Sequence, residues 1–196
     1  PLHHTYLGPE FSNKEIKMAM EKVGLKAKKF DNIEIEAAKL LANGALIGWF
    51  QGRMEFGQRA LGNRSILADP RDVSIKKRIN QTIKSREGFR PFAPSILKDR
   101  VTEYFDVTEG TEVPYMEKVF PIRAERQSEI PAVTHEDGTG RVQTVSKEIN
   151  PKFYQLIEAF DKITGTPILL NTSFNINGEP IVYSPDDALK TFFSCG

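Results

Sequence analysis

The chain contains very little cysteine and histidine, with one and three residues respectively among 196. Cys195 alone cannot form a disulfide within the chain, which fits a reducing compartment, and we expect a cytoplasmic protein. His3 and His4 are adjacent, and His135 lies far from them in the sequence. Neither arrangement has the spacing of a metal site or offers a recognisable base for a serine nucleophile. The sequence therefore predicts no metal site in this chain and no catalytic triad.

Long apolar runs and the common nucleotide-binding motifs are also absent. No apolar stretch approaches the roughly 20 residues that span a bilayer, so we expect no membrane contact. The opening residues, PLHHTYLGPEFS, lack the basic and apolar regions of a signal peptide and a starting Met, which predicts a fragment or a processed chain. Neither a Walker-type loop nor a Gly-x-Gly-x-x-Gly motif occurs. Any nucleotide site must therefore be built from other residues, arginines above all.

Positive charge is concentrated between Gly52 and Pro94. This stretch holds 10 of the 27 Lys and Arg residues but only 4 of the 26 acidic residues, and the rest of the chain is net negative. Gly52, Gly57 and Gly62 allow tight turns and the close approach of a ligand. The planar guanidinium fork suits phosphate and carboxylate groups. Arginines on turns predict a site for a multiply anionic ligand, and a solvated arginine-rich surface is the alternative interpretation.

Four basic residues of this stretch are the first candidates for the anion site. Lys84 and Arg90 lie six positions apart on one predicted loop and are placed to converge on a single phosphate. Arg59 and Arg64 flank Gly62 and are placed to do the same from the preceding turn. Nucleic acid is the other obvious polyanion, and three phenylalanines of the stretch are candidates to stack on bases: Phe56, Phe89 and Phe92. No RNA-binding motif accompanies them, so nucleic acid is not the expected partner.

Helical and strand patterns alternate along the chain. Capping residues and apolar spacing predict helices over residues 12–23, 31–43, 72–83, 150–164 and 184–193. Short apolar or alternating runs predict strands at residues 45–50, 63–68, 94–97, 119–122, 130–134, 141–145 and 166–170. Helices interleaved with short strands indicate an α/β or α+β domain built on a sheet.

A polar group follows the last predicted strand. Asn171, Thr172 and Ser173 come directly after the buried run of residues 166–170, and we interpret them as a turn. Ligands of α/β sheets usually bind where strands end, and these side chains can donate to a carbonyl or phosphate oxygen. Because Asn, Ser and Thr also bond their own backbone in turns, the alternative is a purely structural role.

Three blocks of the sequence carry a resemblance to a known family. GRMEFGQRALGNRSILADPR, KSREGFRPFAPSIL and PILLNTSFNINGEPIV together resemble the C-terminal domain of the O-carbamoyltransferases, which include nodulation-factor and antibiotic-tailoring enzymes. The resemblance covers residues 44–196. Residues 1–43, which contain LGPEFS, resemble the connection from a preceding domain.

The resemblance implies a YrdC-like domain with a twisted, mostly mixed sheet flanked by helices. In the family this domain binds ATP and carbamoyl phosphate and forms carbamoyl adenylate with release of pyrophosphate, and Mg²⁺ is expected to bridge the departing phosphates. A separate N-terminal Kae1-like domain, which holds iron, then passes the carbamoyl group to a substrate hydroxyl. This chain resembles only the activating part, so complete transfer is expected to need the N-terminal domain as a partner.

The family's site residues are transferred by position. Lys84 and Arg90 match phosphate and carbamoyl contacts and are the candidate catalytic residues. Arg141 matches a further basic contact, and Asn171 with Ser173 matches the polar turn that holds the adenylate, with Thr172 between them. Three further arginines are candidates that are equally able to brace a loop through Glu55 or Glu87: Arg59, Arg64 and Arg86.

Two other hypotheses stay open beside a carbamoyl-activating enzyme. One is a non-catalytic nucleotide- or RNA-binding module of the same fold, and the other is a folded but inactive fragment. Pyrophosphate release that depends on carbamoyl phosphate separates the first hypothesis from these two, and RNA binding with a steep salt dependence favours the binding module.

Overall fold

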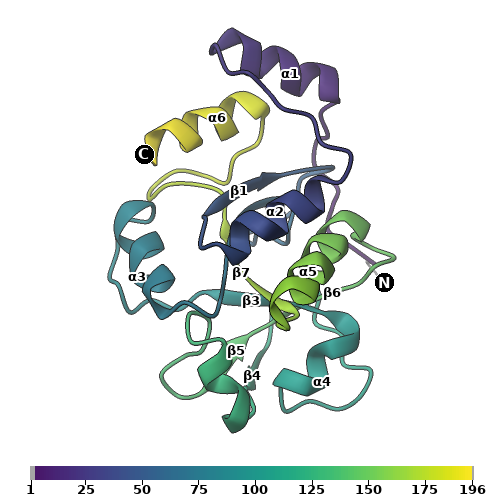
Figure 1. The fold of residues 1–196 in the computed structure, drawn as a ribbon, viewed down its shortest axis with the longest axis vertical. Helices are drawn as coiled ribbons and strands as arrows, with labels where there is room; N and C mark the ends of the chain where they lie inside the picture. The colour runs from purple at the N-terminus through teal and green to yellow at the C-terminus, as the bar shows by residue number, and fades with distance from the viewer. Residues whose placement is uncertain (1–2, 196) are drawn as a thin grey trace.

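The computed structural model describes residues 3–195, and its centre is a five-stranded mixed sheet (Figure 1). The strand order is β1-β2-β7-β3-β6, and only the pair β3-β6 is parallel. The predicted α/β (α+β) class with a mixed sheet is confirmed. The strands of this sheet are β1 (Ile47–Phe50), β2 (Arg64–Ala68), β3 (Ala93–Leu97), β6 (Gln143–Val145) and β7 (Ile168–Ser173).

Helices cover both faces of the sheet (Figure 1). Helices α2 (Ile33–Ala42) and α5 (Pro151–Thr164) pack together on one face, where they share a core with Leu67 and Leu169 of the sheet. Helix α3 (Val73–Thr82) packs on the other face through Ile75 and Ile79. Alternate residues of each strand point to opposite faces, so the all-buried strand β2 contributes to both cores.

The sequence explains where the best-defined helices begin and end. Asn150 caps α5 by accepting from the Phe153 amide, and Gly165 ends it in the left-handed conformation with φ +75°. Ser184 and its partner carboxylate form a capping box at the start of α6 (Pro185–Ser194), as Ser12 does for α1 (Asn13–Lys22). Helices α1 and α6 lie side by side next to β1. No helix of the described residues is long and apolar enough to cross a membrane.

Helix α2 belongs to the core of the sheet domain. It buries Ala37, Ala38 and Leu41 against α5, and its apolar side chains pack with the sheet. Capping by Asp31 was expected at its start, but the helix begins after Asn32, whose side chain makes no capping hydrogen bond. The predicted division into residues 1–43 and 44–196 stays a prediction.

Residues 98–142 form a layer of short elements below the sheet (Figure 1). The predicted strand at residues 130–134 is wrong, because these residues form a turn without ladder pairing. Ile130, Ala132 and Val133 are buried because they pack into the core shared by the sheet and α3. The predicted strand at residues 141–145 is divided at Val142 between two sheets. The elements are η1 (Lys98–Arg100), α4 (Val101–Tyr104), β4 (Val119–Pro121), η2 (Ala124–Glu129) and β5 (Thr139–Arg141), with β4 and β5 paired as a separate two-stranded sheet.

Candidate anion site at the end of strand β7

A cavity of about 120 Å³ opens beside the end of β7. Its lining comes from segments that are far apart in the sequence, and it contains three arginines but no Asp or Glu. The lining residues are Gln58, Arg59, Ala60, Arg86, Pro91, Phe92, Ala93, Met116, Arg141, Asn171, Thr172 and Ser173. Six of the nine predicted site residues therefore meet at one place: Arg59, Arg86, Arg141, Asn171, Thr172 and Ser173.

The polar group at residues 171–173 is part of the sheet rather than a turn. Asn171 pairs with Leu67 and Ala93, and Thr172 pairs with Ile66, so this part of β7 lies between β2 and β3. The interpretation as a turn was wrong because the two neighbouring strands continue the ladder past the apolar run. The side chains are consequently held by a rigid sheet, which positions them more firmly than a loop would.

The arginines of the cavity have no acidic partners. Among the described residues, Arg59, Arg86 and Arg141 make no ion pair. Burial and the neighbouring charge of Arg59 lower the pKa of Arg141, whose Nε is buried without a hydrogen-bond partner. Burial and then the charge of Arg90 lower the pKa of Arg86. Unneutralised cations gathered around one cavity favour an anionic ligand, because an anion relieves their mutual repulsion.

Lys84 lies behind the cavity and does not line it. Its ammonium is buried and donates to four oxygens at the end of β7 and just after it: the Ser173 carbonyl at 2.7 Å, the Ser173 hydroxyl at 3.3 Å, and the Asn175 carbonyl and side chain at 2.9 and 2.7 Å. Burial and then the charge of Arg86 lower the pKa of Lys84 to about 8. Lys84 therefore reaches the cavity through Ser173, whose position it fixes.

Arg90 and Arg64 are also outside the cavity. Arg90 is exposed on the loop after α3, near enough to Arg86 to affect its pKa. Arg64 is fully buried, stacks on the Phe50 ring at 3.6 Å and donates to backbone carbonyls, including that of Gln51 at 2.7 Å. Burial lowers the pKa of Arg64 to about 10. The geometry gives Arg64 a bracing role, which was the alternative for it, and we leave it out of the proposed site.

Glu55 holds the loop that carries Arg59. One oxygen of its buried carboxylate accepts from the amides of Leu61 and Asn63, each at 2.7 Å, and of Arg64 at 3.3 Å. A carboxylate with several backbone donors is a strong organiser of a loop. Its role differs from the expected one, because it binds backbone rather than a guanidinium.

Asn80 does the same for the loop after α3, and no sequence pattern indicated this role. This fully buried side chain donates to the carbonyls of Gly88 and Arg90 at 3.3 and 2.9 Å and accepts from Nε of Arg86 at 2.7 Å. Helix spacing alone marks an asparagine at this position as solvated. Only the return of the loop onto the helix shows that it fixes Arg86.

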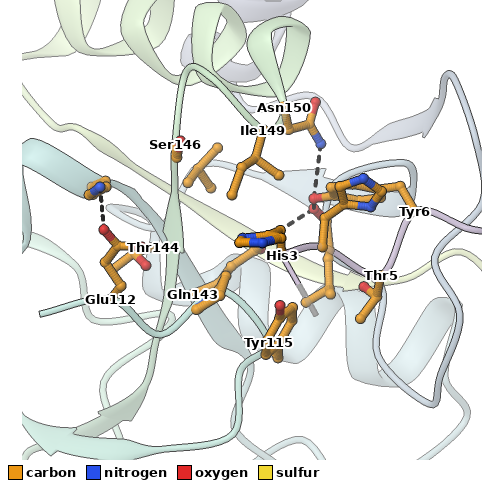
Figure 2. Close-up of a pocket in the computed structure, with 15 residues that line it drawn as sticks. His3, Thr5, Tyr6, Glu112, Tyr115, Gln143, Thr144, Ser146, Ile149 and Asn150 are labelled. Atoms are coloured by element: carbon orange, nitrogen blue, oxygen red, sulfur yellow. Dashed lines mark hydrogen bonds and ion pairs between the residues drawn. The ribbon is translucent and has the colours of Figure 1, made fainter. Parts of the chain in front are cut away.

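A second cavity is lined in part by the N-terminal segment (Figure 2). Tyr6 donates to the Leu61 carbonyl at 2.9 Å and accepts from the Asn150 amide at 3.1 Å, as the close-up shows. Burial raises the pKa of Tyr6 above its ordinary value. These bonds tie the N-terminal segment to the loop that carries Arg59. The cavity has no cluster of cations, so we assign the ligand to the site at the end of β7.

The predicted aromatic contacts to nucleic acid are only partly available. Phe56 and Phe89 are exposed, but Phe92 is buried in the core, with the guanidinium of Arg86 5.1 Å from its ring centre. Of the three candidates for stacking on bases, Phe92 is therefore not available at the surface, although it lines the cavity. The cavity has a volume of about 120 Å³, which suits a small anion rather than a nucleic-acid strand.

Comparison with known proteins identifies the family of this chain. Residues 38–196 match the family model described as carbamoyltransferase C-terminus, and the chain belongs to this family. It is 49% identical over 197 residues to the nodulation protein NolO of Bradyrhizobium diazoefficiens, with 98% of this chain and 36% of the relative covered. It is also 41% identical over 152 residues to the 3'-hydroxymethylcephem-O-carbamoyltransferase of Amycolatopsis lactamdurans, covering 78% and 28%. The chain thus spans about a third of the length of these relatives.

Two solved structures share the fold. Full-length HypF in its phosphate- and nucleotide-bound form aligns with a TM-score of 0.60 at 17% identity, covering 88% of this chain and 21% of that one. Sua5 of P. abyssi, complexed with L-threonine, aligns with a TM-score of 0.58 at 17% identity, covering 86% and 46%. This likeness confirms the predicted YrdC-like fold.

The site offers no ligands for a metal ion of its own. The cavity lining contains no carboxylate, and no group of three or more His, Cys, Asp or Glu in the described part of the chain is placed to hold a metal. The residues present therefore do not fit a protein-bound Mg²⁺ or iron.

Proposed function

We propose that this chain is the carbamoyl-activating domain of an ATP-dependent O-carbamoyltransferase. The observation that carries the proposal is the cavity at the end of β7, where Arg59, Arg86 and Arg141 gather without acidic partners. Membership of the carbamoyltransferase family supports the reaction class, and the YrdC-like fold supports the use of a nucleotide. The substrates proposed are ATP and carbamoyl phosphate.

The reaction needs cations and neutral donors around phosphates. Carbamoyl phosphate and water give carbamate and inorganic phosphate, and a carbamate oxygen then attacks the α-phosphorus of ATP. The bond from the α-phosphorus to the bridging oxygen breaks, which yields carbamoyl adenylate and pyrophosphate. The guanidinium groups of Arg59, Arg86 and Arg141 stabilise the negative charge that collects on the phosphates. The Thr172 hydroxyl, which makes no hydrogen bond within the described residues, is free to donate to a phosphate oxygen as well.

Lys84 and Arg90 have distinct roles in this proposal. Lys84 fixes Ser173 from behind, so it positions the end of β7 against the ligand and adds a positive charge to the site. Arg90 is exposed beside Arg86 and is free to turn onto the part of the nucleotide that extends out of the cavity. Mg²⁺ would enter with the nucleotide, bound to its phosphates, because the cavity has no carboxylate to hold it.

Transfer to a hydroxyl acceptor is proposed to need another part of the protein. The relatives are about three times as long as this chain, which leaves room for the N-terminal Kae1-like domain and its iron. We place the acceptor site on that domain, and the N-terminal domain is therefore the main partner of this chain.

Pyrophosphate release tests the proposal directly. The chain is incubated with ATP and Mg²⁺, with and without carbamoyl phosphate, and pyrophosphate is measured by a coupled assay. Release that depends on carbamoyl phosphate is expected, together with a reduced rate or weaker ATP binding in Lys84→Ala and Arg90→Ala. The control is Lys147→Ala, which changes an exposed lysine away from the cavity.

Two outcomes would contradict the proposal. ATP binding that is unchanged in both Lys84→Ala and Arg90→Ala, measured by calorimetry, would remove these residues from the site. RNA binding with a steep salt dependence, without pyrophosphate release, would favour the alternative of a non-catalytic binding module.

A further inference from the structure

Asn171, which lines the cavity, is hydrogen-bonded to a buried amide, that of Gln143, whose orientation is fixed by the backbone. The Gln143 side chain is buried, and its nitrogen donates to the Leu61 carbonyl at 2.9 Å. A carbonyl only accepts, so this bond determines which end of the Gln143 amide is oxygen. That oxygen then faces the opposite way, where it accepts from the Ser95 hydroxyl at 2.6 Å and from the Asn171 nitrogen at 3.1 Å.

The orientation of Asn171 follows from that of Gln143. Its nitrogen donates to the Gln143 oxygen, to the Ser95 hydroxyl at 3.0 Å and to the Ala60 carbonyl at 3.4 Å. Two of these three groups only accept, so the Asn171 amide cannot turn over without losing both bonds. Its oxygen, Oδ1, is therefore left on the other side, buried and without any hydrogen-bond partner.

An unpartnered buried acceptor costs about 1–3 kcal/mol, so native structures rarely keep one without a reason. Asn171 is 1% exposed and lines the cavity together with the three arginines and Thr172. Since no described residue bonds Oδ1, a ligand bound in the cavity that Asn171 lines is the group placed to supply its partner. A phosphate oxygen cannot serve, because it offers no hydrogen. The missing partner is therefore an N–H or O–H group.

The position of Asn171 limits which donor is suitable. It shares one small cavity with Arg59, Arg86 and Arg141, so the donor has to lie close to a phosphate in the same ligand. The adenine amino group of ATP is separated from the phosphates by the ribose and does not meet this condition. A carbamoyl group bonded to phosphate does, because its NH₂ is attached to the carbon next to the phosphate oxygen.

We infer that Gln143 and Asn171 form a fixed amide pair that selects the carbamoyl group by accepting its N–H. Gln143 is a positioning residue, and Asn171 Oδ1 is the acceptor that distinguishes a carbamoyl phosphate from an acyl phosphate with methyl in place of NH₂. The inference rests on the proposed function, since it assumes that the cavity binds the carbamoyl substrate.

Two stable phosphonates that differ at one group test this inference. Phosphonoacetamide carries NH₂ on its carbonyl, and acetonylphosphonate carries methyl at the same place. Titration calorimetry on the full chain is expected to show phosphonoacetamide binding about tenfold tighter or more, since the methyl analogue leaves Oδ1 without a partner. Pyrophosphate, which has no N–H, is the reference ligand for the arginines.

Variants separate selection from general damage. Gln143→Met removes the bond that orients Asn171, and the preference for phosphonoacetamide should fall to about threefold or less while pyrophosphate affinity stays within about twofold. Asn171→Ala removes the acceptor itself and should give the same loss, which keeps the test valid should Gln143→Met not fold. Gln155→Met, an exposed change of the same type on α5, should keep the full preference.

Each remaining result has a definite meaning. Equal binding of the two phosphonates by the unchanged chain, or a preference that persists in both variants, overturns the inference. Binding of pyrophosphate but of neither phosphonate also overturns it, while leaving the anion site in place. If none of the three ligands binds, the proposed function fails together with the inference.

Discussion

Replacing Arg141 by methionine should stabilise the ligand-free protein and weaken its binding of anions. Arg141 lies half-buried beside Arg59, has no acidic partner, and leaves Nε buried without a hydrogen bond. Methionine keeps most of the apolar contact of the arginine stem but removes the charge and the unpaired donor. Residues that hold an empty site ready for a ligand commonly reduce stability in this way.

The structure sets the size of both effects. An unpaired buried donor costs about 1–3 kcal/mol, and solvent contact of the half-exposed guanidinium reduces this, so we expect the free energy of unfolding to rise by about 1 kcal/mol. For a chain of this length that corresponds to a rise in Tm of about 2–4 °C. A hydrogen bond to a charged group contributes about 1.5–3 kcal/mol, so the Kd for pyrophosphate should rise about 10- to 150-fold.

Arg100→Met is the matched control. Arg100 is exposed to a similar degree but is paired with Glu103 and with Asp161, the latter at 2.8 Å. The same substitution should therefore lower the free energy of unfolding by about 1 kcal/mol or more and leave pyrophosphate binding unchanged. Urea denaturation and titration calorimetry measure the two quantities for both variants.

The sign of the stability change in Arg141→Met shows whether Arg141 is unsatisfied in the ligand-free protein. A destabilised Arg141→Met would show that Arg141 is satisfied in the ligand-free protein, contrary to the reasoning from its orphaned Nε. Unchanged pyrophosphate affinity would show that Arg141 does not face the ligand, and the proposed site would lose one of its three arginines.

Three other predictions concern the loops around the cavity and the lysine behind it. Gly62→Ala should lower the free energy of unfolding by about 1–3 kcal/mol more than Gly57→Ala in urea denaturation. Both glycines have positive φ (+104° and +132°), but only at Gly62 would a Cβ overlap the Phe153 ring, so equal losses of stability would contradict this reasoning. Raising the pH through about 8 should weaken pyrophosphate binding, measured by calorimetry, because Lys84, whose pKa is lowered to about 8, then loses its charge. In Lys84→Arg the affinity should stay constant up to about pH 9, and a parallel decline in the variant would assign the effect to another group. Asn80→Ala should weaken pyrophosphate binding several-fold and lower stability by about 2–3 kcal/mol, since it removes three side-chain hydrogen bonds of the loop after α3; full affinity would show that the loop orders itself.

Most of the secondary structure followed from local pattern. The α5 stripe that includes Phe153 and Phe160 is buried as its spacing predicts, and the caps at Asn150 and Ser184 are present. The strand prediction failed at residues 130–134, where the buried apolar residues belong to a turn and do not pair with another strand. Apolar residues in a packed loop have the same composition as a short strand, so composition alone could not separate them.

The sequence was sufficient to predict which types of residue form the candidate site, but not how they are arranged in space. Arginines on the predicted turns of residues 52–94 indicated an anion site, and Arg59 and Arg86 of this stretch line the cavity. Arg141, which lies on β5, was indicated only by the family resemblance. Arg64 has the same local sequence features, yet it points into the protein, because the strand β2 begins there and its side chain turns inward onto Phe50. Asn80 and Gln143 were missed, since their importance arises from partners 6 to 82 positions away in the sequence.

The position of β7 in the sheet has a consequence for how the protein folds. This strand is the last in sequence among the described strands, yet it inserts between β2 and β3, with Ser173 paired to Ser65 more than a hundred residues earlier. Until it is in place, β2 and β3 have unpaired edges, and the floor of the cavity does not exist. Pairings of such long sequence separation form slowly. Anion binding should therefore be among the last properties to appear during refolding, and its recovery would report the insertion of β7 into the sheet.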